Sequence, residues 1–255
     1  MIDTLILLLP PGVSLEVALL LIVTSLATSM LTAAFGLGGG MGMLAVIANV
    51  LPSAVVIPVH GMVQLGNNLI RSTMYCRHIN WPMVLWFSLG AAIGGVMGIN
   101  IVMTMSKPML QMTLGLFVLY SALAPKHLRR PFGKIGQILS GVTTTFATLF
   151  VGATGPFVAA LLPTRHMARM EVLGTHGALM AVQHGLKIAL FGAFGFAYGP
   201  WLGLLAAMFA VGIAGNFLGR GLHNKLPERY FRRIFQVLLI LLALRLIGVA
   251  LMSWV

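Results

Sequence analysis

Two neighbouring stretches near the start of the chain decide its fold. Residues 15–35 read LEVALLLIVTSLATSMLTAAF, and residues 36–40 follow directly as GLGGG. The first stretch has about the 20 apolar residues that cross a bilayer as a helix. Glycines, in contrast, interrupt a helix and leave its backbone groups bare. The sequence therefore predicts a membrane-spanning helix that ends at a glycine break, followed by a short apolar segment over residues 39–51.

The same alternation of apolar runs and short polar patches continues to the end of the chain. Of 255 residues, 59% are hydrophobic and 8% are charged, against about 25% charged in a soluble domain. Further spans are predicted at residues 54–75, 83–104, 109–125, 134–151, 169–190, 200–219 and 231–251, and a second short segment at 155–163. We therefore predict an all-α membrane protein, a polytopic helical bundle. Because the short segments rise only about 14–20 Å of the roughly 30 Å needed, they are predicted to be broken or re-entrant helices.

A divergent internal repeat relates the two halves of the chain at a constant offset of 116 residues. The matched pairs are Gly36 and Gly152, Gly39 and Gly155, His60 and His176, Gly61 and Gly177, Asn67 and Gln183, Asn68 and His184, and Arg71 and Lys187. We accordingly divide the chain into a first transmembrane repeat at 1–125, a basic cytoplasmic linker at 126–133 and a second transmembrane repeat at 134–255.

The basic residues orient these repeats. The net charge of +12 comes from 16 Lys and Arg against 4 Asp and Glu. Nearly all the basic loop residues fall where a topology with an outside N-terminus places the cytoplasm, and only Lys107 falls in an outside loop. Since cytoplasmic loops carry the excess of Lys and Arg, this pattern predicts two inverted repeats. It also assigns the positive charge to membrane lipid and not to nucleic acid.

The glycine breaks are the first candidate binding elements. The residues concerned are Gly36, Gly38, Gly39 and Gly40 in the first half and Gly152, Thr154 and Gly155 in the second. At membrane depth, bare backbone groups are tolerated where they line a cavity, and a helix N-terminus there offers N–H groups to an anion. Close helix packing is the alternative explanation of small residues; the recurrence of the break in both halves favours the cavity.

Two polar stripes follow the breaks. The residues of the first stripe lie on one face of the predicted helix and are His60, Gln64, Asn67, Asn68 and Arg71. The second stripe comprises His176, Gln183, His184 and Lys187. Polar groups in membrane helices are costly and indicate an aqueous path. The alternatives are interhelical hydrogen bonding for the histidines and snorkelling of Arg71 to lipid phosphates. The span that carries Lys187 runs toward the outside, so the positive-inside rule does not explain a basic residue there. Arg71 and Lys187 form a pair of cations without a mid-membrane carboxylate, which favours a small anion as the substrate.

The sequence lacks the residues that several classes of function require. The sequence has no phosphate-binding lysine motif, no His-Glu-x-x-His zinc motif and no facing pair of aspartates, so neither an enzyme, a metal site nor a cofactor is expected. The single Cys76 excludes an intramolecular disulfide. The first residues carry no Lys or Arg, and Pro10-Pro11 interrupts them, so we expect no cleaved secretory signal.

At the glycine breaks and polar stripes, the chain resembles the sulfite exporter TauE/SafE family, also called the TSUP transporters. Its most specific parts are Gly36-Leu37-Gly38-Gly39-Gly40, His60-Gly61 with Gln64, Asn68 and Arg71, Gly152-Ala153-Thr154-Gly155-Pro156, and Gly174-Thr175-His176 with His184 and Lys187. The resemblance implies a multi-pass protein of the bacterial plasma (inner) membrane that moves sulfite, an organosulfonate or a related small anion outward, driven by an ion gradient. It does not identify the anion.

We therefore predict alternating access between the two halves, with proton coupling through His60, His176 or His184. A passive anion channel, a non-transporting membrane assembly factor and, more remotely, a membrane enzyme stay open as alternatives. The expected partners are a small anion and membrane lipid, with a homodimer as an open option.

Overall fold

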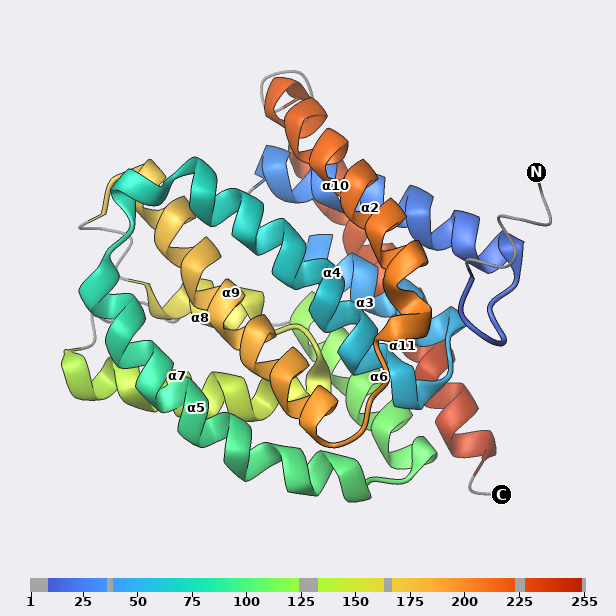
Figure 1. Ribbon diagram of the computed structural model, residues 1–255. Helices are drawn as coiled ribbons and strands as arrows, with labels where there is room; N and C mark the ends of the chain where they lie inside the picture. The colour runs from blue at the N-terminus through green and yellow to red at the C-terminus, as the bar shows by residue number, and fades with distance from the viewer. Residues whose placement is uncertain (1–8, 36–38, 124–132, 163–166, 223–227, 254–255) are drawn as a thin grey trace.

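The computed structural model describes residues 9–35, 39–123, 133–162, 167–222 and 228–253, and all regular structure in these ranges is helical (Figure 1). The α-helices are α2 (Leu15–Phe35), α3 (Gly39–Val50), α4 (Ser53–Met74), α5 (Trp81–Thr104), α6 (Lys107–Leu123), α7 (Lys134–Val151), α8 (Gly155–Leu161), α9 (Arg169–Ala193), α10 (Leu202–Leu222) and α11 (Glu228–Met252). Two 3-10 turns, η1 (Cys76–His78) and η3 (Gly199–Trp201), precede α5 and α10. The prediction of an all-α membrane protein is confirmed.

The predicted segments match the helices apart from their ends. The first span and the span at 134–151 agree with α2 and α7, whereas α9 and α11 are longer than their predicted spans. Apolar composition marks the part of a helix that can face lipid, but helical hydrogen bonding continues into the flanking polar residues. Three stretches, Leu15–Ala34, Trp81–Thr104 and Gly199–Gly219, are long and apolar enough to cross a membrane. The linker predicted at 126–133 lies outside the described residues, except for Gly133.

Glycine and proline produce the break between α7 and α8. Gly152 follows the last residue of α7 with φ of 75°, a conformation that glycine adopts without the penalty of a Cβ atom. Pro156 then lies in the first turn of α8, where its missing N–H costs nothing. With 12 and 7 residues, α3 and α8 rise only about 18 and 10 Å. Both are too short to cross about 30 Å of hydrocarbon alone.

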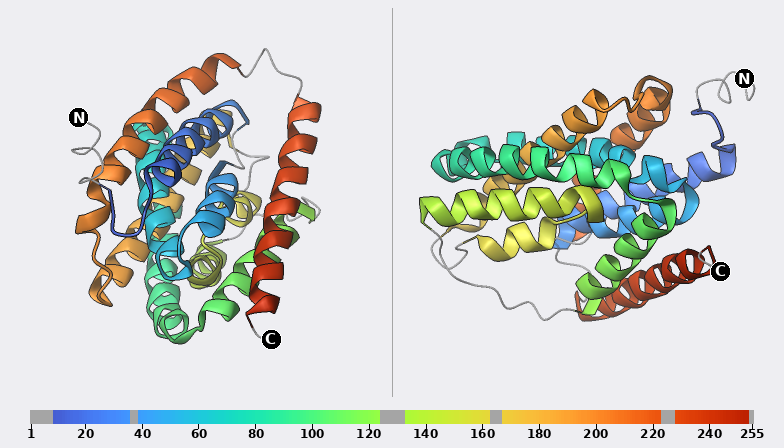
Figure 2. Two further views of the ribbon diagram at one scale, coloured as in Figure 1. Left: turned by 90° about the vertical axis from the view of Figure 1, so that its right-hand side faces the viewer. Right: turned by 90° about the horizontal axis from the view of Figure 1, so that it is seen from below.

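Helices α5 and α7 come from different halves of the chain and lie side by side (Figures 1 and 2). Gly90 packs directly against the backbone of Ile138, and Gly94 packs against the backbone of Val142. Residue numbers therefore rise together along the contact, which makes the two helices parallel. Small residues at intervals of four allow this close approach of two backbones in a membrane.

Helices α2 and α10 repeat this arrangement with the halves exchanged. Gly212 lies beside Ser25 and Ser29, and Gly219 lies against Met30, so this pair is also parallel. By the offset of 116 residues, α2 corresponds to α7 and α10 corresponds to α5. Each half therefore contributes one helix to each of two equivalent pairs.

Helices α4 and α9 cross the centre of the molecule next to each other (Figure 1). Gly61 of α4 faces Lys187 of α9, whereas Arg71 of α4 faces Gly177 of α9. Residue numbers rise on one helix as they fall on the other, so the two are antiparallel. These helices also correspond by the offset of 116 residues, so this one corresponding pair is antiparallel.

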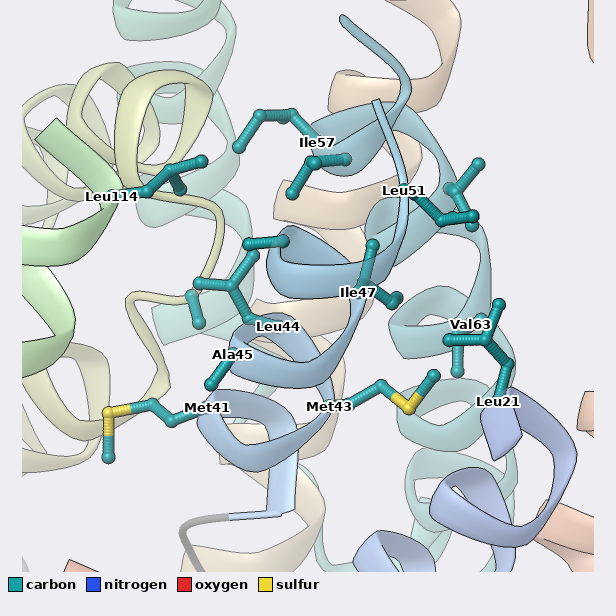
Figure 3. Close-up of a cluster of buried hydrophobic side chains, with 14 of the residues drawn as sticks. Leu21, Met41, Met43, Leu44, Ala45, Ile47, Leu51, Ile57, Val63 and Leu114 are labelled. Carbon is teal, nitrogen blue, oxygen red and sulfur yellow. The ribbon is translucent and has the colours of Figure 1, made fainter. Parts of the chain in front are cut away.

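Most residues of the short helix α3 are buried, and Figure 3 shows the cluster of hydrophobic side chains around it. Its side chains pack with residues of α2, α4 and α6, and the buried cluster includes Leu21, Met43, Leu44, Ala45, Ile47, Ile57, Val63 and Leu114. In a bilayer such packing is stabilised by van der Waals contact more than by exclusion of water. It holds the first turn of α3 at a fixed place beside α4.

Candidate functional site

A histidine ties each short helix to the long helix that follows it. The Nε2–H group of His60 on α4 donates to the carbonyl oxygen of Gly40 in α3, with a distance of 2.9 Å. The Nε2–H group of His176 on α9 donates to the carbonyl oxygen of Gly155 in α8, at 3.0 Å. Because a carbonyl oxygen only accepts, each Nε2 atom must carry the hydrogen. The offset relates these two contacts to each other.

Each of the two basic side chains, Lys187 and Arg71, packs against a helix from the other half of the chain. A Cβ atom added to Gly61 would be 3.1 Å from Cδ of Lys187, and one added to Gly177 would be 3.4 Å from Cβ of Arg71. The charge of Lys187 acts on His60 and the charge of Arg71 acts on His176, so each histidine has the other half's cation as its neighbour. We call His60, Gly40 and Lys187 the lysine half-site, and His176, Gly155 and Arg71 the arginine half-site. Ten residues of helix, or about 15 Å, separate the two levels.

The two half-sites differ in how their cation is satisfied. Lys187 is 0% exposed, and its Nζ donates to the carbonyl oxygen of Gly152 at 2.8 Å. Arg71 is 8% exposed, and its side chain has no hydrogen bond or ion pair with any residue that the structure describes. The ammonium group of the lysine half-site therefore has a hydrogen-bond acceptor within the protein. The guanidinium of the arginine half-site has donors that are not used by the described residues.

Positive charge dominates the region between α4 and α9. The charge of Lys187 acts on His60 and on His184, and that of Arg71 acts on His176. Within the described residues, the acidic side chains Glu16 and Glu171 lie in the first turns of their helices, away from the helix centres. A buried cation without a countercharge is unfavourable by several kcal/mol. The arrangement is chemically suited to an anion.

The side-chain amide of Gln183 belongs to a hydroxyl network on the side of α7. Its Nε2 donates to Oγ1 of Thr144 at 2.8 Å and to Oγ1 of Thr145 at 3.1 Å. Its Oε1 accepts from the hydroxyl of Thr154 at 2.9 Å. Thr154 and Gln183 thereby connect the break before α8 to α7 and α9, and every member of this network is buried.

Asn67 occupies the corresponding place on the side of α2. Its Oδ1 accepts from Oγ of Ser29 at 3.2 Å and from Nδ2 of Asn216 at 3.3 Å. Asn68 instead donates from Nδ2 to the backbone carbonyl of Gln64 at 2.7 Å. The stripe residues therefore do not converge on one point, because the amides of Asn67 and Gln183 turn toward helices α2, α10 and α7.

The glycines of the breaks also divide into two kinds. A Cβ atom on Gly39 would collide with the backbone of Thr28, and one on Gly152 would be 2.6 Å from Leu44. These two glycines are needed for close packing, the alternative considered above. Gly40 borders the side-chain amide of Gln64, with 3.3 Å from an added Cβ to Oε1, and Gly155 borders His176 at 3.9 Å. Gly36 and Gly38 lie outside the described residues, and N–H donation from the breaks to an anion stays a prediction.

Several polar residues of these networks were not predicted from the sequence. They are Ser25, Ser29, Thr144, Thr145 and Asn216. The signal was present, because Thr28, Ser29 and Thr32 correspond to Thr144, Thr145 and Thr148 at the same offset of 116. Hydroxyl groups that bond to the preceding helical turn are common in membrane helices, which makes such a stripe inconspicuous.

Arg245 of α11 was also missed, and it holds the end of α3. Its Nη1 donates to the backbone carbonyl of Asn49 at 2.9 Å and to Oδ1 of Asn49 at 2.7 Å. In return, Nδ2 of Asn49 donates to the carbonyl of Leu242 at 3.3 Å. Carbonyl groups at the C-terminus of a helix lack partners within the helix, and a basic side chain satisfies them favourably.

Replacing Arg245 with Met is expected to loosen the end of α3 and to destabilise the protein by about 1 kcal/mol, the value of a hydrogen bond at an exposed site. The measurement is the thermal unfolding midpoint of purified protein in detergent. Arg245→Lys should recover part of the loss, because it restores one donor. Arg233→Met, an exposed change at the start of the same helix, is the control. Equal midpoints for Arg245→Met and Arg233→Met would contradict the role of Arg245.

The family described as sulfite exporter TauE/SafE matches residues 20–246, which include all the described residues of both half-sites. No curated protein matches the chain.

Proposed function

The chain belongs to the sulfite exporter TauE/SafE family of membrane transporters, and from this premise we propose that it is a secondary-active exporter of sulfite, an organosulfonate or a related small anion. One observation carries the proposal: two buried cations, Arg71 and Lys187, each lie beside a histidine of the other half, with no ion pair among the described residues. An oxyanion would supply the missing negative charge.

We propose further that the halves are inverted repeats in a multi-pass protein of the bacterial inner membrane, with the N-terminus outside. The antiparallel contact of α4 and α9 supports this, because these helices correspond in the repeat. In this orientation Arg71 lies toward the cytoplasm and Lys187 toward the outside. An anion that enters from the cytoplasm would then reach Arg71 first, and one that enters from the outside would reach Lys187 first.

The sharing of each half-site between the repeats provides a mechanism for alternating access. When one repeat rocks against the other, each cation moves relative to the histidine of the opposite repeat. In the described conformation Lys187 is bonded to Gly152, whereas the guanidinium of Arg71 has available donors. This arrangement suits binding of the anion at Arg71 from the cytoplasmic side. The anion would then be transferred to Lys187, whose Nζ would exchange the carbonyl oxygen of Gly152 for an oxygen of the anion.

The two cations suit different stages of this path. A guanidinium presents paired donors that match two oxygens of a sulfonate or sulfite group, so Arg71 favours oxyanions over halides. An ammonium group is a compact charge with rotatable donors. It can leave one acceptor and take another without a fixed geometry, which is what release requires.

Exchange across liposome membranes tests the proposal. Purified protein is reconstituted with unlabelled sulfite, sulfate, thiosulfate or sulfoacetate inside, and the entry of the same labelled anion is measured. A secondary transporter is expected to show saturable entry that is accelerated by unlabelled anion on the far side. Entry that rises linearly without such acceleration would indicate a passive channel. No entry of any of these anions would favour a non-transporting assembly factor.

A further inference from the structure

Two histidine side chains from different halves meet beside Lys187. The rings of His60 on α4 and His184 on α9 have centroids 5.8 Å apart and an interplanar angle of 75°, an edge-to-face contact. The Nδ1 atoms of both rings are buried and have no hydrogen-bond partner among the described residues. Buried polar atoms without partners are rare in folded proteins and require an explanation.

The tautomer of His60 defines what its unpartnered atom can do. Its Nε2 carries the hydrogen that Gly40 accepts at 2.9 Å, so in the neutral ring Nδ1 has a free lone pair. This lone pair can accept a proton without breaking the contact with α3. The pair of His60 and His184 thus has basic sites that the fold leaves unused.

The arginine half-site lacks such a pair. The offset relates His60 to His176 but relates His184 to Asn68, whose amide does not titrate in the physiological range. Asn68 is moreover engaged with the carbonyl of Gln64 at 2.7 Å. Of the three histidines predicted as coupling residues, the geometry therefore singles out His60 and His184.

The charges around the pair decide what a bound proton requires. Lys187 acts on both rings, and His184 is also influenced by His60 and His176. The described parts of the neighbouring helices α3, α5, α7, α8 and α10 contain no carboxylate. A second positive charge beside Lys187 would therefore be unbalanced in a buried site. An anion bound at Lys187 supplies the balance, and by linkage each of the two ligands then favours the binding of the other.

We propose that His60 and His184 together bind one proton with each anion, so that the proton and the anion cross the membrane in the same direction. This inference rests on the proposed function. The proton comes from water on the side to which the half-site is open, adds to an imidazole nitrogen lone pair and returns to water on the other side. The transported unit has the charge of the anion plus one. For a dianion this unit stays negative, so a membrane potential that is negative inside favours its export.

The test uses labelled thiosulfate and sulfoacetate, which keep their charge near neutral pH. Proteoliposomes with the membrane potential clamped at zero are given an outside solution about one pH unit more acidic than the inside. Wild-type protein is expected to accumulate the anion about tenfold at steady state, because one unit equals about 1.4 kcal/mol for one coupled proton. With no pH gradient, accumulation should be absent and exchange should continue.

The His184→Gln protein is expected to lose accumulation, with a ratio near one, while exchange without a gradient persists, and His60→Gln is expected to lose accumulation as well. Glutamine at position 60 keeps a donor for Gly40 but does not titrate. His78→Gln, an exposed change in η1 outside both half-sites, is the control and should accumulate like wild type. Wild-type protein that exchanges the anion but does not accumulate it under the pH gradient, or accumulation by His184→Gln at the wild-type ratio, would overturn the inference. Absence of exchange in the wild type would instead refute the proposed function.

Discussion

Anion exchange by the Lys187→Met protein is expected to fall by at least about 30-fold. Lys187 is 0% exposed, and its ammonium is the charge that would meet the anion in the lysine half-site. Removing one partner of a buried, hydrogen-bonded charge pair costs about 2–5 kcal/mol. Methionine retains the length of the side chain, and the carbonyl of Gly152 keeps the hydroxyl of Thr148 as a donor at 3.1 Å, so folding should persist. The measurement is the initial rate of exchange in proteoliposomes.

Lys134→Met provides the control for loss of a positive charge. Lys134 begins α7 and lies 5.3 Å from the centre of the Trp86 ring, away from both half-sites. It should exchange within about twofold of wild type, as expected for a surface pair worth at most about 1 kcal/mol. If Lys187→Met also exchanged at the wild-type rate, the cation would not contact the anion, and the proposed path would be wrong.

Gly94→Leu is expected to abolish the folded protein or to destabilise it by at least about 3 kcal/mol, beyond the usual cost of an overpacked core. The first atom of any side chain at Gly94 would collide with the backbone carbonyl of Val142. Backbone cannot move aside as a flexible side chain can, so α5 and α7 would have to separate along their whole contact. The measurement is the yield of monodisperse protein in size-exclusion chromatography together with its thermal midpoint.

Gly248→Leu is the matched control within the same protein. Gly248 lies in α11, and an added Cβ would have no atom within 4 Å. The substitution should leave yield and midpoint near those of wild type, and by replacing glycine in a helix it could add a few tenths of a kcal/mol. Normal yield and midpoint for Gly94→Leu would show that the close contact of α5 and α7 is not required.

The sequence by itself determined the helical membrane architecture and the positions of the breaks. Long apolar runs leave few alternatives to helices, because in lipid each backbone group must find its partner within its own segment. The break at Gly152 could also be predicted from the sequence, because glycine and proline have local conformational effects that do not depend on distant contacts. The repeat also brought out the polar stripes, because sequence comparison at one offset needs no coordinates.

Tertiary structure alone decided which residues of the stripes face one another. Helical periodicity states that His60, Asn67 and Arg71 share a face, but it does not state which helix lies opposite or in which direction that helix runs. The antiparallel contact of α4 and α9 puts Lys187 beside His60 and sends Asn67 toward Ser29 and Asn216. The pairing of His60 with His184, and the bond from Arg245 to Asn49, depend on packing between segments far apart in sequence, and for that reason no local pattern could reveal them.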